Sequence, residues 1–179
     1  MKKRTTAEMN RLSIEAFQSA NKLPFIVVLD NVRSQHNVGA VFRTADAMLL
    51  EGIYLCGICS IPPNKEIHKT ALGAEESVPW KYFEDTQEAI QALQQAGYTC
   101  YAVEQAHDAI TLEQAADNIH QTPQPIAIVL GHEVFGVQQE VVDACDGCIE
   151  IPQYGTKHSM NVSVTAGIVM YRLSEAMRD

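Results

Sequence analysis

The residues of this chain best suited to chemistry lie in three polar clusters, and each cluster follows a stretch typical of a buried strand. Asn37-Val-Gly-Ala-Val-Phe-Arg43 follows residues 25–29, and Gly131-His-Glu-Val-Phe-Gly136 follows residues 126–130. The third cluster, Ser159-Met-Asn161, comes after a predicted strand at residues 148–151. Open α/β sheets bind their ligands at the carboxyl ends of the strands, so we expect the three clusters to belong to one site.

The segment from Ile151 to Gly167 indicates how the third cluster is held. Pro152 ends the hydrogen-bond ladder of the strand, and Gly155 allows the main chain to turn. Ser159 is placed to cap the first amides of a predicted helix at residues 161–177. We therefore expect this segment to hold a ligand through its backbone.

Strand-like and helix-like stretches alternate along the chain, which predicts an α/β fold with a parallel sheet and helices on both faces. The predicted strands are residues 25–29, 52–58, 78–83, 98–103, 126–130 and 148–151. The predicted helices are residues 7–19, 38–50, 86–95, 137–144 and 161–177, with a weaker one at 111–116. With 179 residues, 46% of them hydrophobic, the chain can bury one substantial core, so we expect a single domain.

The net charge of −9 argues mildly against a nucleic-acid binder, because phosphate neutralisation requires Lys and Arg. The charge is unevenly distributed, however. No Lys or Arg lies between Lys81 and Lys157, whereas six lie in the first 33 residues. This pattern fits one RNA-facing basic surface beside an acidic solvated one, and the basic residues 2–4 also fit a frayed solubilising tail.

Composition also bears on the compartment and on metals. No apolar run approaches the ~20 residues of a membrane span, and the first residues lack the apolar stretch of a signal peptide, so we expect a cytoplasmic protein with no membrane contact. Two C-x-x-C pairs, Cys56 with Cys59 and Cys145 with Cys148, could be read as a zinc site. Each pair overlaps a predicted strand or its edge, so we favour apolar packing of reduced thiols and expect no metal.

Taken together, the motifs resemble those of a known family. Asn-x-Gly-x-x-x-Arg at 37–43, Gly-x-Glu-x-x-Gly at 131–136 and Ile-Pro-x-x-Gly-x-x-x-Ser-x-Asn-Val-Ser at 151–163 resemble the SpoU/TrmH branch of the SPOUT superfamily, the S-adenosylmethionine-dependent RNA 2′-O-ribose methyltransferases. The resemblance covers about residues 22–177. It implies a deep C-terminal trefoil knot, at about 126–170, that holds the cofactor, and a homodimer acting on tRNA or rRNA. Residues 1–21 would then be an N-terminal helical extension to a methyltransferase domain at 22–179.

The resemblance also implies roles for single residues. Arg43 matches the family's catalytic arginine, and because a guanidinium stays protonated we expect it to hold an RNA phosphate and to stabilise a developing alkoxide. Asn37 is expected to order Arg43 or Glu133, and Glu133 to hold the active-site loops or to accept a hydrogen bond from Asn37 or Ser159. Ser159 and Asn161 match the polar pair of the third motif. The expected cofactor contacts are Val103, Glu104, Leu130, Gly131, Ile151 and Met160.

Plainer interpretations of these features stay open at this point. A lone helical arginine is usually a surface residue, and an asparagine or glutamate at a helix start is usually a cap or a dipole partner. The segment from Lys69 to Glu75 also matches the family, and its Gly73 could simply relieve a tight turn. On the closing helix, the apolar face of Val164, Ile168 and Tyr171 suits a subunit interface or packing on the sheet. For the whole chain, the alternative hypothesis is an RNA-binding member of the same fold that has lost catalysis.

Overall fold

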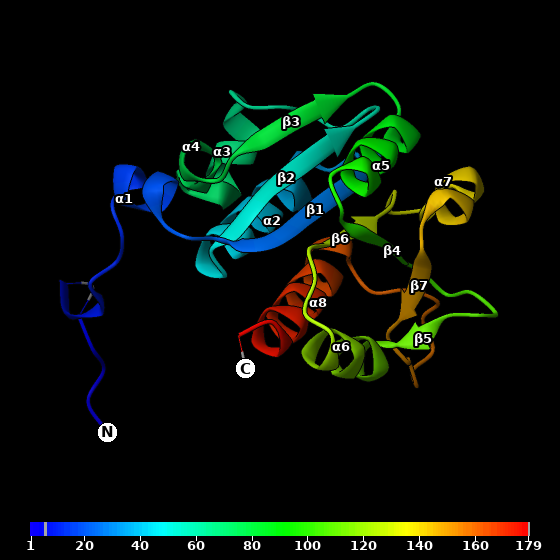
Figure 1. The fold of residues 1–179 in the computed structure, drawn as a ribbon. Coiled ribbons are helices and arrows are strands. Elements are labelled where there is room, and N and C mark those ends of the chain that lie inside the picture. Colours follow the sequence, from blue (N-terminus) through cyan, green and yellow to red (C-terminus); the bar gives the residue numbers. More distant parts are fainter. Residues whose placement is uncertain (6, 179) are drawn as a thin grey trace.

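The computed structural model describes residues 1–5 and 7–178 and contains a seven-stranded sheet in which every pairing is parallel. The strand order is β3-β2-β1-β6-β4-β7-β5 (Figure 1). The strands are β1 Leu23–Asp30, β2 Leu50–Cys56, β3 Trp80–Phe83, β4 Thr99–Val103, β5 Ile110–Thr111, β6 Ile126–Leu130 and β7 Gly147–Glu150. The parallel α/β fold expected from the sequence is thereby confirmed.

Helices cover both faces of the sheet, as the alternating pattern predicted (Figure 1). Two helical segments precede the sheet, the 3-10 turn η1 Ala7–Met9 and the helix α1 Ile14–Ser19. The other helices are α2 Gln35–Ala47, α3 Lys65–Ala71, α4 Ala74–Ser77, α5 Thr86–Gln95, α6 Leu112–Gln121, α7 Gln139–Ala144 and α8 Val162–Ala176.

The core consists of two layers separated by the sheet. Successive side chains of a strand point to opposite faces, so Phe25, Val27 and Leu29 of β1 pack in one layer while Ile26 and Val28 pack in the other. The first layer is shared with α2, α3, α4, α6 and α8, and the second with α5 and α7. All eight residues of β1 except the first two are buried, as expected for a central strand of a parallel sheet.

The predicted helix at residues 7–19 is wrong as one continuous element. The chain forms η1 at Ala7–Met9, and a new helix starts only after Ser13, whose side chain accepts a hydrogen bond from the Ala16 amide at 3.1 Å. Leu12 is therefore outside the helix and 56% exposed, whereas Phe17 of α1 is buried.

Residues 57–79 hold elements that periodicity did not reveal. The short helices α3 and α4 are separated by Leu72 and Gly73, both with positive φ, at 54° and 95°. Gly73 thus occupies the tight turn that the sequence allowed for. The two-residue strand β5 was not predicted either, and α6 extends to Gln121 from a capping box at Thr111 and Gln114. The remaining differences are shifts of element ends. Within the described residues, we find no helix long and apolar enough to cross a membrane.

Candidate active site

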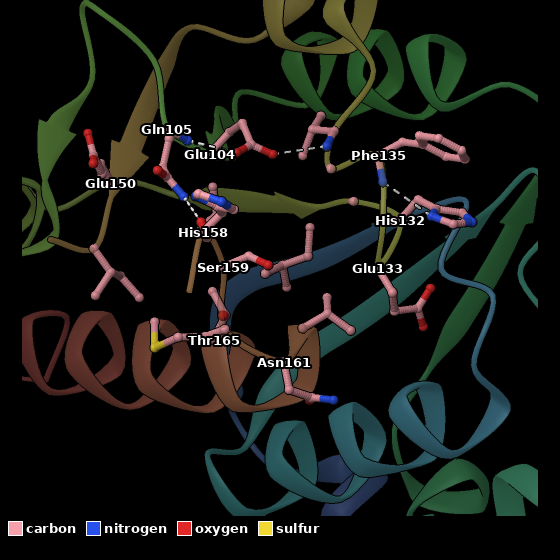
Figure 2. A pocket seen from close by; sticks show the side chains of 18 of the residues that line it. Glu104, Gln105, His132, Glu133, Phe135, Glu150, His158, Ser159, Asn161 and Thr165 are labelled. Carbon is pink, nitrogen blue, oxygen red and sulfur yellow. Dashed lines mark hydrogen bonds between the residues drawn. The ribbon is translucent and has the colours of Figure 1, made fainter. Parts of the chain in front are cut away.

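A cavity lies at the carboxyl ends of β4, β6 and β7, next to the start of α8 (Figure 2). Its volume is ≈ 630 Å³, within the range of pockets that bind drug-sized ligands. Strand-end residues Val103, Leu130 and Ile149 form part of its wall, and the segments that follow these strands complete it. The site is therefore placed where an open α/β sheet is expected to bind a ligand.

The loop after β6 is tightly folded and forms one wall of the cavity. His132 and Gly136 exchange two backbone hydrogen bonds, at 3.0 and 2.9 Å, and His132 Nδ1 accepts a further one from the Val134 amide at 3.0 Å. A Cβ on Gly131 would lie only 2.1 Å from the Gly136 carbonyl carbon. Only glycine at position 131 allows the two ends of this loop to approach so closely.

Two residues at the end of β4 tie this loop and the loop before α8 to the sheet. The Glu104 carboxylate accepts hydrogen bonds from the amides of Val137, at 3.2 Å, and Gln105, at 2.8 Å. The Gln105 side chain donates to the His158 carbonyl at 2.5 Å (Figure 2). Glu104 therefore has a structural role in addition to lining the cavity.

A polar cluster joins the three sequence motifs at the rim of the cavity. Asn37 Nδ2 donates to Glu133 Oε1 at 2.9 Å, and Asn161 Nδ2 donates to Asn37 Oδ1 at 3.2 Å. Glu133 also accepts hydrogen bonds from the amides of Arg33, at 3.0 Å, and Ser34, at 2.9 Å. Asn37 and Glu133 are therefore hydrogen-bond partners of each other, and neither Arg43 nor Ser159 takes part in this contact. One candidate residue of each motif therefore lies in this cluster, as the strand-end argument predicted.

The Glu133 carboxylate is held in its charged form by these contacts. Burial raises its pKa, but the hydrogen bonds from Asn37 and from the Ser34 and Arg33 amides outweigh burial, so the pKa is lowered from the ordinary value of 4.5. At neutral pH the side chain is an acceptor of hydrogen bonds and not a donor.

The start of α8 differs from the expected one. Asn161, and not Ser159, is the N-cap: its Oδ1 accepts hydrogen bonds from the amides of Ser163, at 2.9 Å, and Val164, at 3.3 Å. The prediction that Ser159 caps this helix is wrong, because the helix begins two residues later than that role requires. Ser159 instead lies in the exposed segment before α8 and lines the cavity (Figure 2).

Arg43 stands apart from the cavity and from the polar cluster. It is exposed on α2, six residues after Asn37, a rise of ~9 Å along a helix axis. Within residues 1–5 and 7–178 its side chain has no hydrogen-bond or ion-pair partner, so the ordering of Arg43 by Asn37 has no support. Its guanidinium is free to bind an external anion.

All six expected cofactor residues line the cavity. Glu133, Ser159 and Asn161 line it too, whereas Asn37 reaches it only through its hydrogen bonds. The lining includes three carboxylates, those of Glu104, Glu133 and Glu150, and contains neither lysine nor arginine among the residues that the structure describes. The cavity therefore suits a ligand with an apolar body and positive charge.

Sequence reasoning missed Gln105, which lines the cavity, and Asp30, which holds the segment beside it. Asp30, the fully buried last residue of β1, accepts hydrogen bonds from Thr86 Oγ1 at 2.7 Å and from the Gln138 amide at 3.1 Å. A carboxylate directly after an apolar strand was a signal available in the sequence, because a buried charge requires specific donors. Gln105 left no such signal, since its partner is a backbone carbonyl 53 residues away.

The cysteines do not assemble into a common site in the described part of the chain. All five are free thiols, and Cys56, Cys59 and Cys100 are buried. Cys59 donates to the Leu29 carbonyl and accepts from the Val32 amide, so it connects the end of β1 to the next loop. Burial raises the pKa of Cys56 to about 12 and of Cys59 to about 11, which makes both thiols unreactive near neutral pH.

Comparison with known proteins agrees with this geometry. Residues 24–171 match the SpoU rRNA Methylase family. The chain is 32% identical over 173 residues to the 23S rRNA (guanosine-2′-O-)-methyltransferase RlmB of Vibrio parahaemolyticus, covering 96% of this chain and 66% of that protein. It is 31% identical over 172 residues to the tRNA (guanosine(18)-2′-O)-methyltransferase of Thermus thermophilus, covering 96% and 84%. The crystal structure of the TrmH/SpoU tRNA modifying enzyme of A. aeolicus superposes with a TM-score of 0.78 at 25% identity, covering 92% and 80%.

The parallel sheet and the cavity at its strand ends place this chain among the α/β proteins that bind a ligand at the carboxyl edge of the sheet. Within that class, the chain belongs to the SpoU rRNA Methylase family. It spans only 62 to 66% of the length of the first three curated relatives.

The Glu133 contacts generate a prediction about pH and stability. At neutral pH, Glu133→Gln should destabilise the protein by ~1–2 kcal/mol, because a glutamine offers one acceptor oxygen in place of two. A lowered carboxyl pKa stabilises the fold above the unfolded value near 4.5 and loses that contribution as pH falls through the folded pKa. The gap between wild type and variant should therefore close below about pH 4.5, as measured by urea unfolding at a series of pH values.

Glu140→Gln, on an exposed position of α7, serves as the matched control and should show no such gap. A difference between wild type and Glu133→Gln that stays constant from pH 7 to pH 3 would contradict the prediction.

Proposed function

We propose that this protein is an S-adenosylmethionine-dependent methyltransferase that acts on a ribose 2′-hydroxyl of structured RNA, either tRNA or rRNA. The observation that carries the proposal is the hydrogen-bonded cluster of Asn37, Glu133 and Asn161 at the rim of a cavity lined by all six expected cofactor residues. The names of the relatives support it, since they describe 2′-O-methyltransferases of a 23S rRNA and of a tRNA. The intact cluster favours an enzyme over a catalytically inactive RNA-binding member of the fold.

The volume of the cavity and its carboxylates suit S-adenosylmethionine. Val103, Leu130, Ile151 and Met160 would hold the adenosine by apolar contact, and the strand-end backbone at Gly131 would approach it closely. When bound, the cofactor supplies an electrophilic methyl group on a positively charged sulfonium. The carboxylates of the cavity provide a favourable potential for that charge, which is lost when the methyl group leaves.

The chain's own residues then have to position the acceptor ribose and stabilise developing charge. Arg43 binds an RNA phosphate and stabilises the developing alkoxide, since a guanidinium does not give up its proton. Glu133 fixes the loop after β6 against the start of α2 and the N-cap of α8. Ser159, exposed at the cavity, is free to hydrogen-bond the cofactor or the ribose.

The backbone of residues 126–170 is proposed to form the deep trefoil knot of the SPOUT superfamily. Support comes from the way in which one continuous segment supplies the loop after β6, the loop after β7 and the start of α8, all of which line the same cavity. The superposition on the A. aeolicus enzyme over 92% of this chain also supports it. The division at residue 21 and the cytoplasmic location stay predictions.

A homodimer with α8 at its interface is also part of the proposal. Val164, Ile168 and Tyr171 form an apolar face of α8 and are 53%, 39% and 56% exposed. Because α8 packs beside α2, a second copy on this face would lie near Arg43. That arrangement explains how an arginine remote from the cavity of its own chain could act at a site between subunits.

The reaction itself is the first test. Incubation with labelled S-adenosylmethionine and total small RNA, followed by digestion, should yield a labelled dinucleotide resistant to alkali, because the blocked 2′-hydroxyl cannot cleave the chain. Activity should fall steeply as salt rises, since phosphate contacts are displaced. If the label were found only on bases, with every backbone linkage alkali-labile, the methyl acceptor would be a base and not the proposed ribose 2′-hydroxyl.

The role of Arg43 gives a second test. Arg43→Ala should reduce the methyl-transfer rate at least about a hundredfold, as removal of one charge-stabilising donor commonly does. Cofactor affinity measured by calorimetry should change less than a few-fold, because Arg43 does not line the cavity. Lys81→Ala is the control, since this exposed cation of β3 lies over Tyr54 on the face of the sheet opposite α2. Loss of cofactor binding in Arg43→Ala would overturn the assigned role.

The dimer can be tested through α8. Light scattering should report a dimer at micromolar concentration, with an interface of well over ~1,000 Å². Ile168→Glu should convert it into a monomer by placing a charge in the apolar face, whereas Glu88→Lys, exposed on α5 on the other side of the sheet, should not. A wild-type protein that is monomeric at this concentration would contradict the proposed assembly.

A further inference from the structure

A second cavity, also ≈ 630 Å³, lies between α3, α4 and the edge strand β3. It shares no residue with the cavity of the candidate active site. The family-like segment from Lys69 to Glu75, which has no role in the proposed reaction so far, connects α3 to α4 beside it. Its lining consists of Pro62, Pro63, Asn64, Lys65, His68, Glu75, Glu76 and Trp80.

The walls of this second cavity suit a flat heteroaromatic ring. Trp80, partly buried, and the two prolines provide stiff apolar surfaces. Among the described residues, neither the Glu76 carboxylate nor the Lys65 ammonium has a hydrogen-bond or ion-pair partner. A ring that enters the cavity therefore meets one free acceptor group and one free donor group.

The other carboxylate of the second cavity is already engaged. Glu75, with a side chain only 8% exposed, contacts His68 Nδ1 at 2.5 Å and accepts a hydrogen bond from the Gly73 amide at 3.1 Å. These contacts fix the imidazole at one side of the cavity. Glu76 is thus the acidic group that is free to recognise a ligand.

The second cavity belongs to the same side of the sheet as α2. Thr70 Oγ1 on α3 donates to the His36 carbonyl at 2.9 Å, and His36 Nε2 lies 2.9 Å from Glu66 Oε2. A Cβ on Gly39 of α2 would lie 2.3 Å from the Ile67 carbonyl oxygen, which shows how closely α2 and α3 pack. RNA bound at the exposed Arg43 of α2 would therefore continue over α3.

We propose that the second cavity binds a nucleobase of the RNA substrate, and that this base belongs to a nucleotide other than the methylated one. The inference rests on the proposed function. Strand β3 lies three strand spacings from β6, or ~14 Å at about 4.8 Å each. That separation exceeds the distance from a ribose to its own base, so the base in the second cavity is a neighbouring one.

The free polar groups favour guanine over the other bases. Guanine presents two adjacent N–H donors, on N1 and N2, that a carboxylate such as Glu76 can accept together. Its O6 and N7 are acceptors, for which lysine is a common partner. Adenine lacks the adjacent pair of donors, and the single ring of a pyrimidine covers less of Trp80. Stacking on an aromatic side chain adds affinity for any base. A higher affinity for guanine than for the other bases would therefore come from the polar contacts with the free groups of the cavity.

The test uses Trp80, which is the only tryptophan of the chain and so reports on this cavity alone. Its fluorescence is titrated with GMP, AMP, CMP and UMP, with correction for nucleotide absorbance and without cofactor. We expect saturable quenching by GMP with an affinity at least about fivefold above that of AMP. In Glu76→Gln this preference should disappear, while Glu88→Gln, exposed on α5 across the sheet, should keep it.

The titration needs neither methyl transfer nor cofactor, so its result tests base binding in the second cavity independently of the proposed methyltransferase activity. Non-saturable quenching that is equal for the four nucleotides would overturn the proposed base binding. So would saturable quenching by Mn²⁺ without any response to GMP, since the ligand atoms of His68, Glu75 and Glu76 lie within 4.8 Å of one another and would then form a cation site. In an active enzyme, Glu76→Gln should raise the KM for RNA about tenfold and leave kcat unchanged, a split that a general folding defect would not produce.

Discussion

The carboxylate of Glu133 is the contact on which the candidate site depends. It joins three segments that are far apart in the chain: the turn before α2, the loop after β6 and, through Asn37, the N-cap of α8. The sheet makes this possible because β1 and β6 are parallel neighbours, with Leu29 opposite Leu130, so the loops after them emerge side by side. A partly buried carboxylate without these donors would be costly, and the loops are therefore held in one relative arrangement.

The cavity beside this cluster is open because the loop after β6 folds tightly on itself. Gly131 and Gly136 let the loop after β6 fold on itself, and a Cβ at Gly136 would lie 2.2 Å from Glu104 Oε2. Glu104 and Asp30 then hold the following residues through the Val137 and Gln138 amides. The carboxylates of Asp30, in β1, and Glu104, directly after β4, thus accept hydrogen bonds from consecutive amides, so contacts within the protein hold the wall of the cavity in place. Such preorganisation reduces the free energy that binding would otherwise spend on ordering the loop.

Patterns local in sequence predicted the sheet and the position of the site, whereas features that depend on distant contacts were missed. The strands at residues 25–29 and 126–130 were evident from their continuous apolar runs, and the strand-end rule then located the cavity. The helices α3 and α4 were missed because they are seven and four residues long, too short for periodicity to show. The cap of α8 was assigned to Ser159 in place of Asn161, since both residues are good caps and only the three-dimensional course of the loop decides between them.

The uneven charge along the sequence acquires a meaning in the fold. The stretch between Lys81 and Lys157, which lacks basic residues, supplies β4, β6, β7 and the loops after them, and therefore most of the wall of the acidic cavity. The exposed cations Arg43, Lys65 and Lys69 lie instead on α2 and α3. Under the proposed function, a cationic cofactor and a polyanionic RNA are attracted to different parts of the molecule, and the carboxylates of the cavity repel phosphate. A net charge of −9 is then compatible with RNA binding, because what guides the RNA is the local potential over α2 and α3 and not the total charge.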